Sequence, residues 1–248
     1  MLFAEWRLIS TGAADCYVNM AIDEATLILV AEGRAPPTVR LYFWDAPCQT
    51  IGYLQRLGKK GLARLPRPGC KCVRRLTGGQ ACLHGGDLSY SVTVSMADTL
   101  IPSNVLASYQ RISAGVIEGL RLLGVDARYA PPTEIQVDRH VIATAAQARR
   151  QGVLLHQGTV ALTRTESEVG EIVPACSLTP LSDLVGAEIE MGEAVQALGM
   201  GLKRALGVDL SPSALFAKEK RLARQLLREK YARPNWTFAL VGSDRNSK

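Results

Sequence analysis

The 248-residue sequence has no long apolar run and few aromatic or histidine residues. Its longest apolar stretch, Ala25 to Ala31, is broken by Thr26 and is far shorter than the roughly 20 residues that a membrane-spanning helix needs. No basic segment followed by an apolar one begins the sequence, so we expect no secretory leader. Because 47% of the residues are hydrophobic, the chain can bury a substantial core. We therefore expect a folded cytoplasmic protein with no membrane contact.

Signatures of common cofactor and metal sites are also missing. Neither the GxGxxG fingerprint of dinucleotide-binding folds nor a GxxxxGK[ST] phosphate-binding loop occurs. The six cysteines form no dense framework of the kind found in secreted disulfide scaffolds. Cys70 and Cys72 have no second cysteine pair to complete a zinc site. The sequence therefore predicts reduced thiols and no metal-ligand set.

Acidic residues are absent from one strongly basic stretch. The net charge is +6, and residues 56–75 contain eight Lys or Arg with no Asp or Glu. A second basic run occupies residues 218–233. Such surfaces can attract nucleic acid, an anionic nucleotide or an acidic protein, or they can simply be solvated. Because no aromatic residue is interleaved in the first run and no zinc-finger or basic-zipper pattern occurs, we expect no nucleic-acid partner.

The segment from Cys70 to Ser95 carries the clearest local pattern. Arg74 and Arg75 end an alternating stretch, a threonine follows, and Gly78-Gly79 permit a tight turn or close approach of a ligand. Residues 87–95 then alternate apolar with polar, as in a strand with one buried face. Arginines, a hydroxyl and paired glycines at the end of a strand can cradle a phosphate or carboxylate. An ordinary hairpin with solvated arginines is the alternative.

The same segment closely resembles the RRxTGGxAxxH…LxYS signature of the lipoate-protein ligase A and octanoyltransferase family, which shares its fold with biotin ligases. The resemblance continues in NMAIDEA at residues 19–25, in the strands over 36–55 and in the helix over 103–124. It implies an α+β fold in which helices cover a central mixed or antiparallel β-sheet, as in class II synthetases. We expect one domain over residues 1–241 and a polar tail over 242–248.

The resemblance also implies an activity. Family members attach a lipoyl or octanoyl group to a specific lysine of an acidic lipoyl carrier domain, through an acyl-AMP or an acyl thioester. ATP and Mg²⁺ would be co-substrates of the first route, lipoate or octanoate would supply the acyl group, and an acyl carrier protein is a further possible partner. The basic surface over 56–75 would meet the acidic carrier. The candidate substrate-binding residues are Arg75, Thr77, Gly78, Gly79, His84, Ile142, His156 and Gly158.

The most informative departure from the family pattern is at position 141, and the family's two glycines are also replaced, by Arg139 and Thr144. Residues 134–147 align without gaps to the segment ELVVxGxKIxGSAQ, whose lysine contacts the activated acyl carbonyl in the relatives, but Val141 occupies that position here. A valine cannot stabilise a developing oxyanion. His140 would point to the opposite side of an extended strand. The alternative interpretation is therefore a catalytically impaired lipoyl- or acyl-binding paralogue, or a subunit that depends on a partner.

Cys176 is the candidate catalytic nucleophile. The segment around it, IVPACS, is similar to the InPCG cysteine segment of one octanoyltransferase branch, with the cysteine displaced by one position. A nucleophilic cysteine requires a nearby cation or helix N-terminus that lowers its pKa, and an inert small apolar residue is the alternative role. A biotin-ligase-like transcriptional regulator is a third interpretation of the chain, although we find no helix-turn-helix segment ahead of the family pattern. Adjacent Asp23 and Glu24 are expected to make surface or structural contacts.

Overall fold

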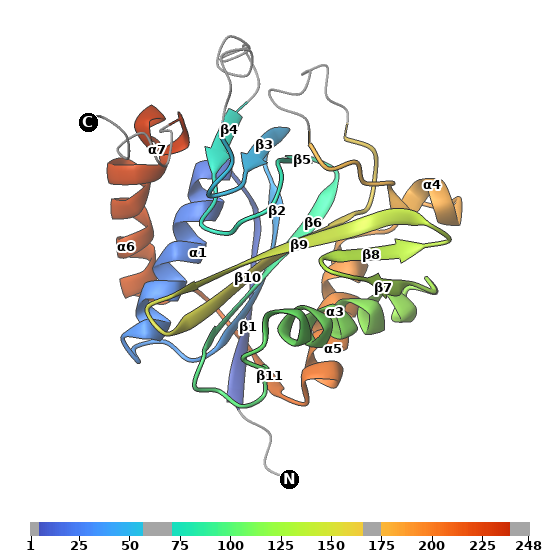
Figure 1. Ribbon diagram of the computed structural model, residues 1–248, viewed down its shortest axis with the longest axis horizontal. Coiled ribbons are helices and arrows are strands. Elements are labelled where there is room, and N and C mark those ends of the chain that lie inside the picture. The colour runs from blue at the N-terminus through green and yellow to red at the C-terminus, as the bar shows by residue number, and fades with distance from the viewer. Residues whose placement is uncertain (1–4, 57–70, 166–174, 239–248) are drawn as a thin grey trace, which may run out of the picture.

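The computed structural model describes residues 5–56, 71–165 and 175–238, and Figure 1 shows their arrangement. Eight strands form a mixed sheet in the order β11-β1-β2-β6-β10-β9-β8-β7. Their bounds are β1 Glu5–Ala14, β2 Thr38–Trp44, β6 Asp87–Ser95, β7 Arg128–Ala130, β8 Glu134–Val137, β9 His140–Arg150, β10 Val153–Ala161 and β11 Asp209–Ser213. β1 pairs in parallel with β2 and with β11, and the remaining pairs are antiparallel. The predicted mixed sheet is confirmed.

Helices cover both faces of this sheet (Figure 1). α3 (Val105–Leu122) and α5 (Met191–Leu206) pack together on one face, where Gly119 and Gly201 let the two backbones approach closely. α1 (Cys16–Ala31) and α6 (Ala217–Leu226) lie on the other face, followed by the π-helix η1 (Leu227–Tyr231) and α7 (Pro234–Phe238). The short helix α4 (Leu181–Val185) lies beyond β10. None of the described helices is long and apolar enough to cross a membrane.

Because helices cover both faces of the sheet, one prediction from the sequence, an exposed face on β6, is wrong. The alternation over residues 87–95 predicts one buried and one exposed face, but nearly every residue of β6 is buried. α1 covers the polar face, and the hydroxyls there are satisfied by buried carboxylates: Ser89 donates to Asp87 at 3.0 Å and Ser91 donates to Asp23 at 2.9 Å. Polar residues in the strand therefore mark a buried hydrogen-bond network instead of a solvated face.

Capping residues define where the helices begin. Asp15 caps α1 by accepting a hydrogen bond from the backbone N–H of Tyr17 at 2.8 Å. The prediction that a helix begins at Ser103 is one residue early, because Asn104 is the cap and accepts from the N–H of Ala107 at 3.0 Å. Side-chain acceptors at these positions satisfy backbone donors that have no partner within the helix.

A second, three-stranded sheet lies near one end of the large one (Figure 1). It consists of β4 (Lys71–Arg74), β3 (Cys48–Ile51) and β5 (Cys82–His84), with β3 parallel to β4 and antiparallel to β5. The RRLTGG loop connects β4 to β5. The two sheets therefore bring that loop against β9 and β10 of the large sheet, as the hydrogen bond from the N–H of Gly78 to the carbonyl of Gln147 shows.

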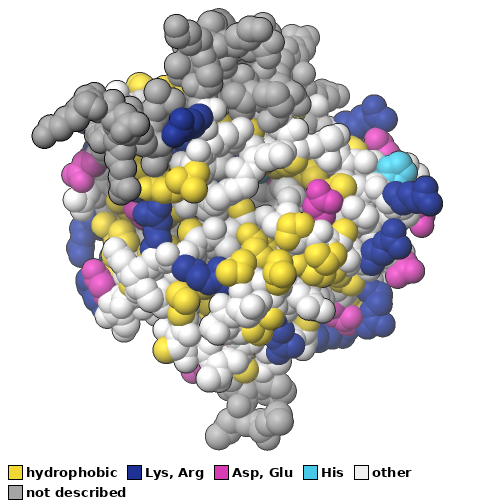
Figure 2. Space-filling view, in the orientation of Figure 1, with side chains coloured by type: hydrophobic (Ala, Val, Ile, Leu, Met, Phe, Trp, Pro, Cys, Tyr) yellow, Lys and Arg dark blue, Asp and Glu magenta, His cyan; other side chains and the backbone are white. Residues whose placement is uncertain are grey.

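The basic stretch over 56–75 is only partly a surface. Residues 57–70 lie outside the described part of the chain, as does the predicted tail at 242–248. Arg74 and Arg75 are buried, so the expectation that they form part of an exposed basic patch is wrong. Arg56 is exposed, and Lys71 is half exposed and pairs with Asp15. Figure 2 shows further basic side chains near the edges of one face of the molecule, with hydrophobic side chains between them.

Candidate active site

A cavity of about 330 Å³ lies between the two sheets, at the low end of the range for small-molecule sites. One part of its wall is apolar or aromatic and consists of Met20, Tyr42, Trp44, Tyr109, Ala145 and Ala146. Another part is polar and includes Thr50, Arg75, Cys82, His84, Glu134, Gln157 and Cys176. A molecule with a short alkyl chain and a polar head would match these two kinds of surface.

Arg75 is the cation of this cavity. Its Nε donates to the hydroxyl of Thr77 at 3.1 Å and its Nη1 donates to the hydroxyl of Thr50 at 3.1 Å. Its Nη2 donates to the carbonyls of Gly78 at 2.5 Å and of Gln80 at 2.7 Å. The guanidinium therefore braces the turn that follows it. Gly79 is needed there because its φ is +84° and a Cβ would lie 3.1 Å from Arg75 Nη2.

No carboxylate neutralises Arg75 among the residues that the structure describes. Buried Arg40, in contrast, pairs with Asp23 at 2.8 Å, and buried Arg7 pairs with Glu219. Burial lowers the pKa of Arg75, yet a guanidinium keeps its charge in proteins. A buried positive charge without a counterion, on the wall of a cavity, favours binding of an anion or of an oxygen that gains negative charge.

Arg74 has a different role from Arg75. Its Nη1 donates to the carbonyls of Gly52 at 2.8 Å and Gln55 at 2.8 Å, and its Nε donates to the carbonyl of Thr237 at 3.1 Å. These bonds fasten the turn after β3 to α7. Arg74 is not part of the cavity wall, so only the second arginine of the RR pair faces the cavity.

A polar chain holds the RRLTGG loop against the large sheet. Thr77 donates to Gln157 Oε1 at 2.7 Å, and Gln157 Nε2 donates to Asp23 Oδ2 at 2.6 Å. Asp23 is fully buried, whereas the neighbouring Glu24 forms an ion pair with Lys230 at 2.7 Å. The expectation of surface or structural contacts for this acidic pair agrees with both positions. Thr77 supports the loop from behind and is itself fully buried.

Cys176 lies on the cavity wall beside a second thiol. Its backbone N–H donates to the carbonyl of Ala81 at 2.8 Å, and Ala81 forms a parallel bridge with Ala175, so Cys176 is a neighbour of Cys82. A hydrogen bond from Cys82 and the charge of Arg75 lower the pKa of the Cys176 thiol, although burial opposes them. The contact with Cys176 and burial raise the pKa of the Cys82 thiol. Cys176 therefore has the environment that a nucleophilic cysteine requires.

The remaining candidate residues differ in how they relate to the cavity. His84 and Gly158 line it, but His156 and Ile142 do not. Ile142 is fully buried in the main core, and His156 is buried between the rings of Tyr90 and Tyr109. Gln147 donates to His156 Nδ1 at 2.9 Å, and burial lowers the pKa of His156 to about 3, with the charge of Arg149 as the second cause. His156 is therefore a neutral structural imidazole at pH 7.

Gly158 is required by its neighbour across the strand pair. Tyr90 faces it on β6, and a Cβ at position 158 would lie 2.3 Å from the Cζ atom of that ring. Gly158 also lines the cavity, so its missing side chain leaves room for both the tyrosine and a bound molecule.

The cation that the family pattern places at position 141 has no direct replacement on the cavity wall. Val141 is the second residue of β9, and its carbonyl accepts from the N–H of Thr179 at 2.7 Å, which brings the loop after Cys176 alongside it. Arg149 donates to the side chain of Gln147 at 2.9 Å, and Arg150 stacks over Tyr53 at 4.2 Å. Neither arginine lines the cavity, and Arg75 is the one described cation that does.

Sequence reasoning missed several cavity residues. The predicted substrate-binding residues do not include Thr50, Trp44, Cys82 or Gln157, although all four line the cavity. The signal that was available for Thr50 and Cys82 is their register, since they face each other on β3 and β5. That pairing becomes visible only after the small sheet is known.

Comparison with known proteins assigns the fold and site to a family. Residues 15–203 match the lipoyl protein ligase A/B catalytic domain, and the chain belongs to this family. Among curated relatives, octanoyltransferase LipM of Kyrpidia tusciae is 35% identical, with 94% of this chain and 98% of that protein covered. Octanoyltransferase LipM of Geobacillus kaustophilus is 32% identical, and the same fractions of the two chains are covered. The predictions of the family and of an enzyme are confirmed.

Solved structures confirm the predicted fold. A lipoate-protein ligase A solved with bound ATP has a TM-score of 0.81 and 26% identity, with 97% of this chain and 100% of that chain covered. A bipartite lipoate protein ligase of Thermoplasma acidophilum, studied with its E2 lipoyl domain, has a TM-score of 0.83 and 24% identity, with 98% and 100% covered.

Proposed function

We propose that this chain transfers an octanoyl or lipoyl group from a thioester donor to a lysine of an acidic lipoyl carrier domain, with Cys176 as the nucleophile that carries the acyl group. The single observation that supports this route best is the position of Cys176 in a cavity beside Arg75, a buried cation without a carboxylate partner. The names of the curated relatives, which are octanoyltransferases, support the same route.

The chemistry follows from the contacts of the cavity. The Cys176 thiolate attacks the acyl carbonyl of the donor, the bond from that carbon to the donor sulfur breaks, and the donor leaves as a thiolate. The positive charge of Arg75 stabilises the oxyanion that develops on the carbonyl oxygen. The carrier lysine then attacks the new thioester, which forms the amide and releases Cys176. The alkyl chain would lie against the apolar part of the wall, next to Met20, Tyr42 and Trp44.

Two parts of the proposal concern regions beyond the cavity. The carrier would dock where its lysine can reach the cavity, and the net charge of +6 on this chain would favour an acidic domain. Residues 1–241 would form the catalytic domain, consistent with the family match over 15–203.

The experiment supplies two donors in parallel. Octanoyl acyl carrier protein, or octanoate with ATP and Mg²⁺, is incubated with the chain and an apo lipoyl domain, and mass spectrometry follows octanoylation of each protein. We expect octanoyl transfer from the thioester without ATP, and an acylated chain that disappears in Cys176→Ala. Cys16→Ala, which removes a buried thiol from α1, is the matched control and should retain transfer.

Other outcomes contradict the proposal in distinct ways. Transfer that requires ATP, or that persists in Cys176→Ala, would replace the thioester route with an acyl-AMP route. If the unmodified chain transfers octanoate from neither donor but Val141→Lys does, the result would favour the interpretation as a catalytically impaired paralogue.

A further inference from the structure

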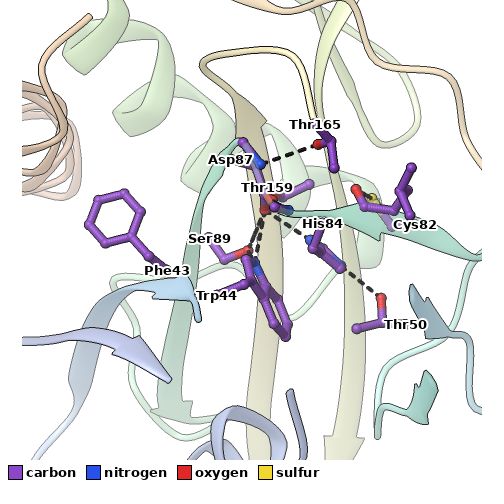
Figure 3. Close-up of polar contacts among 12 residues, drawn as sticks. Phe43, Trp44, Thr50, Cys82, His84, Asp87, Ser89, Thr159 and Thr165 are labelled. Carbon is purple, nitrogen blue, oxygen red and sulfur yellow. Dashed lines mark hydrogen bonds and ion pairs between the residues drawn. The ribbon is translucent and has the colours of Figure 1, made fainter. Parts of the chain in front are cut away.

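Three residues form a hydrogen-bonded chain that starts at the cavity wall and ends in the interior (Figure 3). Thr50 Oγ1 lies 2.9 Å from His84 Nε2, and His84 Nδ1 lies 2.8 Å from Asp87 Oδ2. Thr50 and His84 line the cavity, whereas Asp87 is buried behind them. Three different strands, β3, β5 and β6, supply these residues.

The positions of the protons follow from the neighbours. Arg75 Nη1 lies 3.1 Å from Thr50 Oγ1, and a guanidinium can only donate. Thr50 therefore accepts from Arg75. The Asp87 carboxylate can only accept, so a neutral His84 carries its proton on Nδ1, and its Nε2 then accepts from the Thr50 hydroxyl. Hydroxyl, imidazole and carboxylate thus have the order and direction of a Ser-His-Asp triad.

Asp87 has enough donors to remain ionised in the interior. Its Oδ2 accepts from Trp44 Nε1 at 3.0 Å, from Ser89 at 3.0 Å and from the hydroxyl of Thr159, and its Oδ1 accepts from the N–H of Gly85 at 2.9 Å. Burial alone would raise the pKa of Asp87, but His84 and the hydrogen bonds from Thr159 and Gly85 hold it below the ordinary value. A fixed carboxylate at this position orients the imidazole and stabilises an imidazolium.

Trp44 holds the ring of His84 from its other side. The two rings stack with centroids 4.1 Å apart, and both ring nitrogens of His84 are already bonded. His84 therefore cannot turn toward a substrate, and it can exchange a proton with the substrate only through Thr50. Both residues line the cavity, but only the Thr50 hydroxyl can exchange a proton with a bound molecule, because both ring nitrogens of His84 are already bonded.

Few other groups on the cavity wall can accept a proton. Arg75 cannot, and Cys176 is already assigned as the nucleophile. The contact with Cys176 and burial raise the pKa of the Cys82 thiol, which therefore keeps its proton and cannot accept another. The carboxylate of Glu134 is the competing acceptor, and it accepts from Gln136 Nε2 at 3.1 Å. No imidazole or second carboxylate supports it in the described contacts.

We propose that Thr50, His84 and Asp87 are a proton relay for the second half of acyl transfer. This inference rests on the proposed function. As the carrier amine attacks, its nitrogen bonds to the acyl carbon, the bond from that carbon to the sulfur of Cys176 breaks, and Cys176 leaves as a thiolate. The amine proton passes to Thr50 Oγ1 while the hydroxyl proton passes to His84 Nε2. The products are the amide, a thiolate and one imidazolium, which later releases its proton to solvent.

The test separates the two half-reactions. Thr50→Val keeps the shape of the side chain and removes the hydroxyl, whereas Thr50→Ser keeps the hydroxyl. Formation of octanoyl-Cys176 from octanoyl acyl carrier protein is timed first by mass spectrometry. Apo lipoyl domain is then added to the preloaded protein, and the single-turnover rate of amide formation is measured.

We expect Thr50→Val to load Cys176 within a few-fold of the unmodified chain but to form the amide about 10²- to 10⁴-fold more slowly, the range typical of a lost acid-base group. The acylated protein should therefore accumulate. Thr50→Ser should form the amide at close to the original rate. Glu134→Gln removes the competing acceptor and should not reproduce the selective loss of the amide step.

Contrary results are distinguishable from one another. An unchanged amide step in Thr50→Val, or an equal loss in both steps, would overturn the relay and leave Thr50 a structural residue. A large loss confined to the amide step in Glu134→Gln would move the acceptor to Glu134. Failure of the unmodified chain to acylate Cys176 would overturn the proposed function, and the relay with it. Circular dichroism checks the fold of each variant, and Thr50→Ala replaces Thr50→Val if the latter does not fold.

Discussion

Replacing Gly158 by alanine tests whether β6 and β10 meet as the structure shows. The new Cβ would lie 2.3 Å from Cζ, 2.4 Å from Oη and 2.6 Å from Cε1 of Tyr90. Tyr90 is 1% exposed, stacks on His156 with centroids 5.7 Å apart, and lies 3.3 Å from its Nε2 atom. The ring has to move by about an ångström to reach ordinary van der Waals contact, in a core packed as densely as an organic crystal.

The magnitude follows from two opposing contributions. Overpacking of a core costs about 1–3 kcal/mol, and contact with three ring atoms places this change near the upper end. Alanine restricts the unfolded chain and returns about 0.4–1 kcal/mol. We therefore expect Gly158→Ala to lose about 2 kcal/mol of unfolding free energy. For a chain of this size that loss lowers Tm by about 4–8 °C.

Thermal and urea unfolding, followed by circular dichroism, measure the effect. Gly78→Ala is the control, because a Cβ there meets nothing within 4 Å and the backbone is not in the left-handed region. Tyr90→Leu combined with Gly158→Ala should cost less than the sum of the two single changes, since the smaller side chain removes the clash. A Tm equal to that of the unmodified chain, or strict additivity in this cycle, would refute the packing argument.

Three further outcomes can be measured independently. Alkylation of Cys176 should require higher pH in Cys82→Val than in the unmodified chain, because the hydrogen bond that lowers its pKa is lost; an unchanged pH profile in mass spectrometry would contradict this. Glu219→Gln should cost about 3–5 kcal/mol in urea unfolding, because it leaves the buried Arg7 guanidinium without its counterion, and a loss below 1 kcal/mol would contradict that role. Between about pH 6.5 and pH 3 the unfolded chain binds a proton at His156 that the folded chain does not, so stability should fall as pH is lowered through this window. His156→Gln should flatten that part of the pH profile, and a profile of unchanged slope would refute the assignment.

The family signature predicted the position of the site better than its internal roles. Arg75, Gly79, His84 and Gly158 all line the cavity, as the resemblance implied for substrate-binding residues, whereas Thr77 supports the loop from behind. Local spacing cannot distinguish a residue that faces a cavity from one that braces it. Their binding roles stay predictions until a ligand is present.

Buried polar residues show the same limit of sequence patterns. Alternation over residues 87–95 indicates a strand, but only the helix packed on its polar face shows that Ser89 and Ser91 are buried. A hydroxyl that will donate to a buried carboxylate is indistinguishable, in the sequence, from one that will face water. The carboxylate that accepts from Ser91 belongs to Asp23, which is distant in sequence.

The sequence by itself determined the family, the mixed α+β fold, the RRLTGG turn and the two candidate groups Arg75 and Cys176. These follow from local order, since periodicity and turn chemistry act over a few residues. Only the tertiary structure decided that Cys82 lies beside Cys176, that Arg75 has no carboxylate partner in the described chain, and that His84 bridges Thr50 and Asp87. Those relations depend on which strands pair across long sequence separations, and the pairing is selected by burial of the whole core.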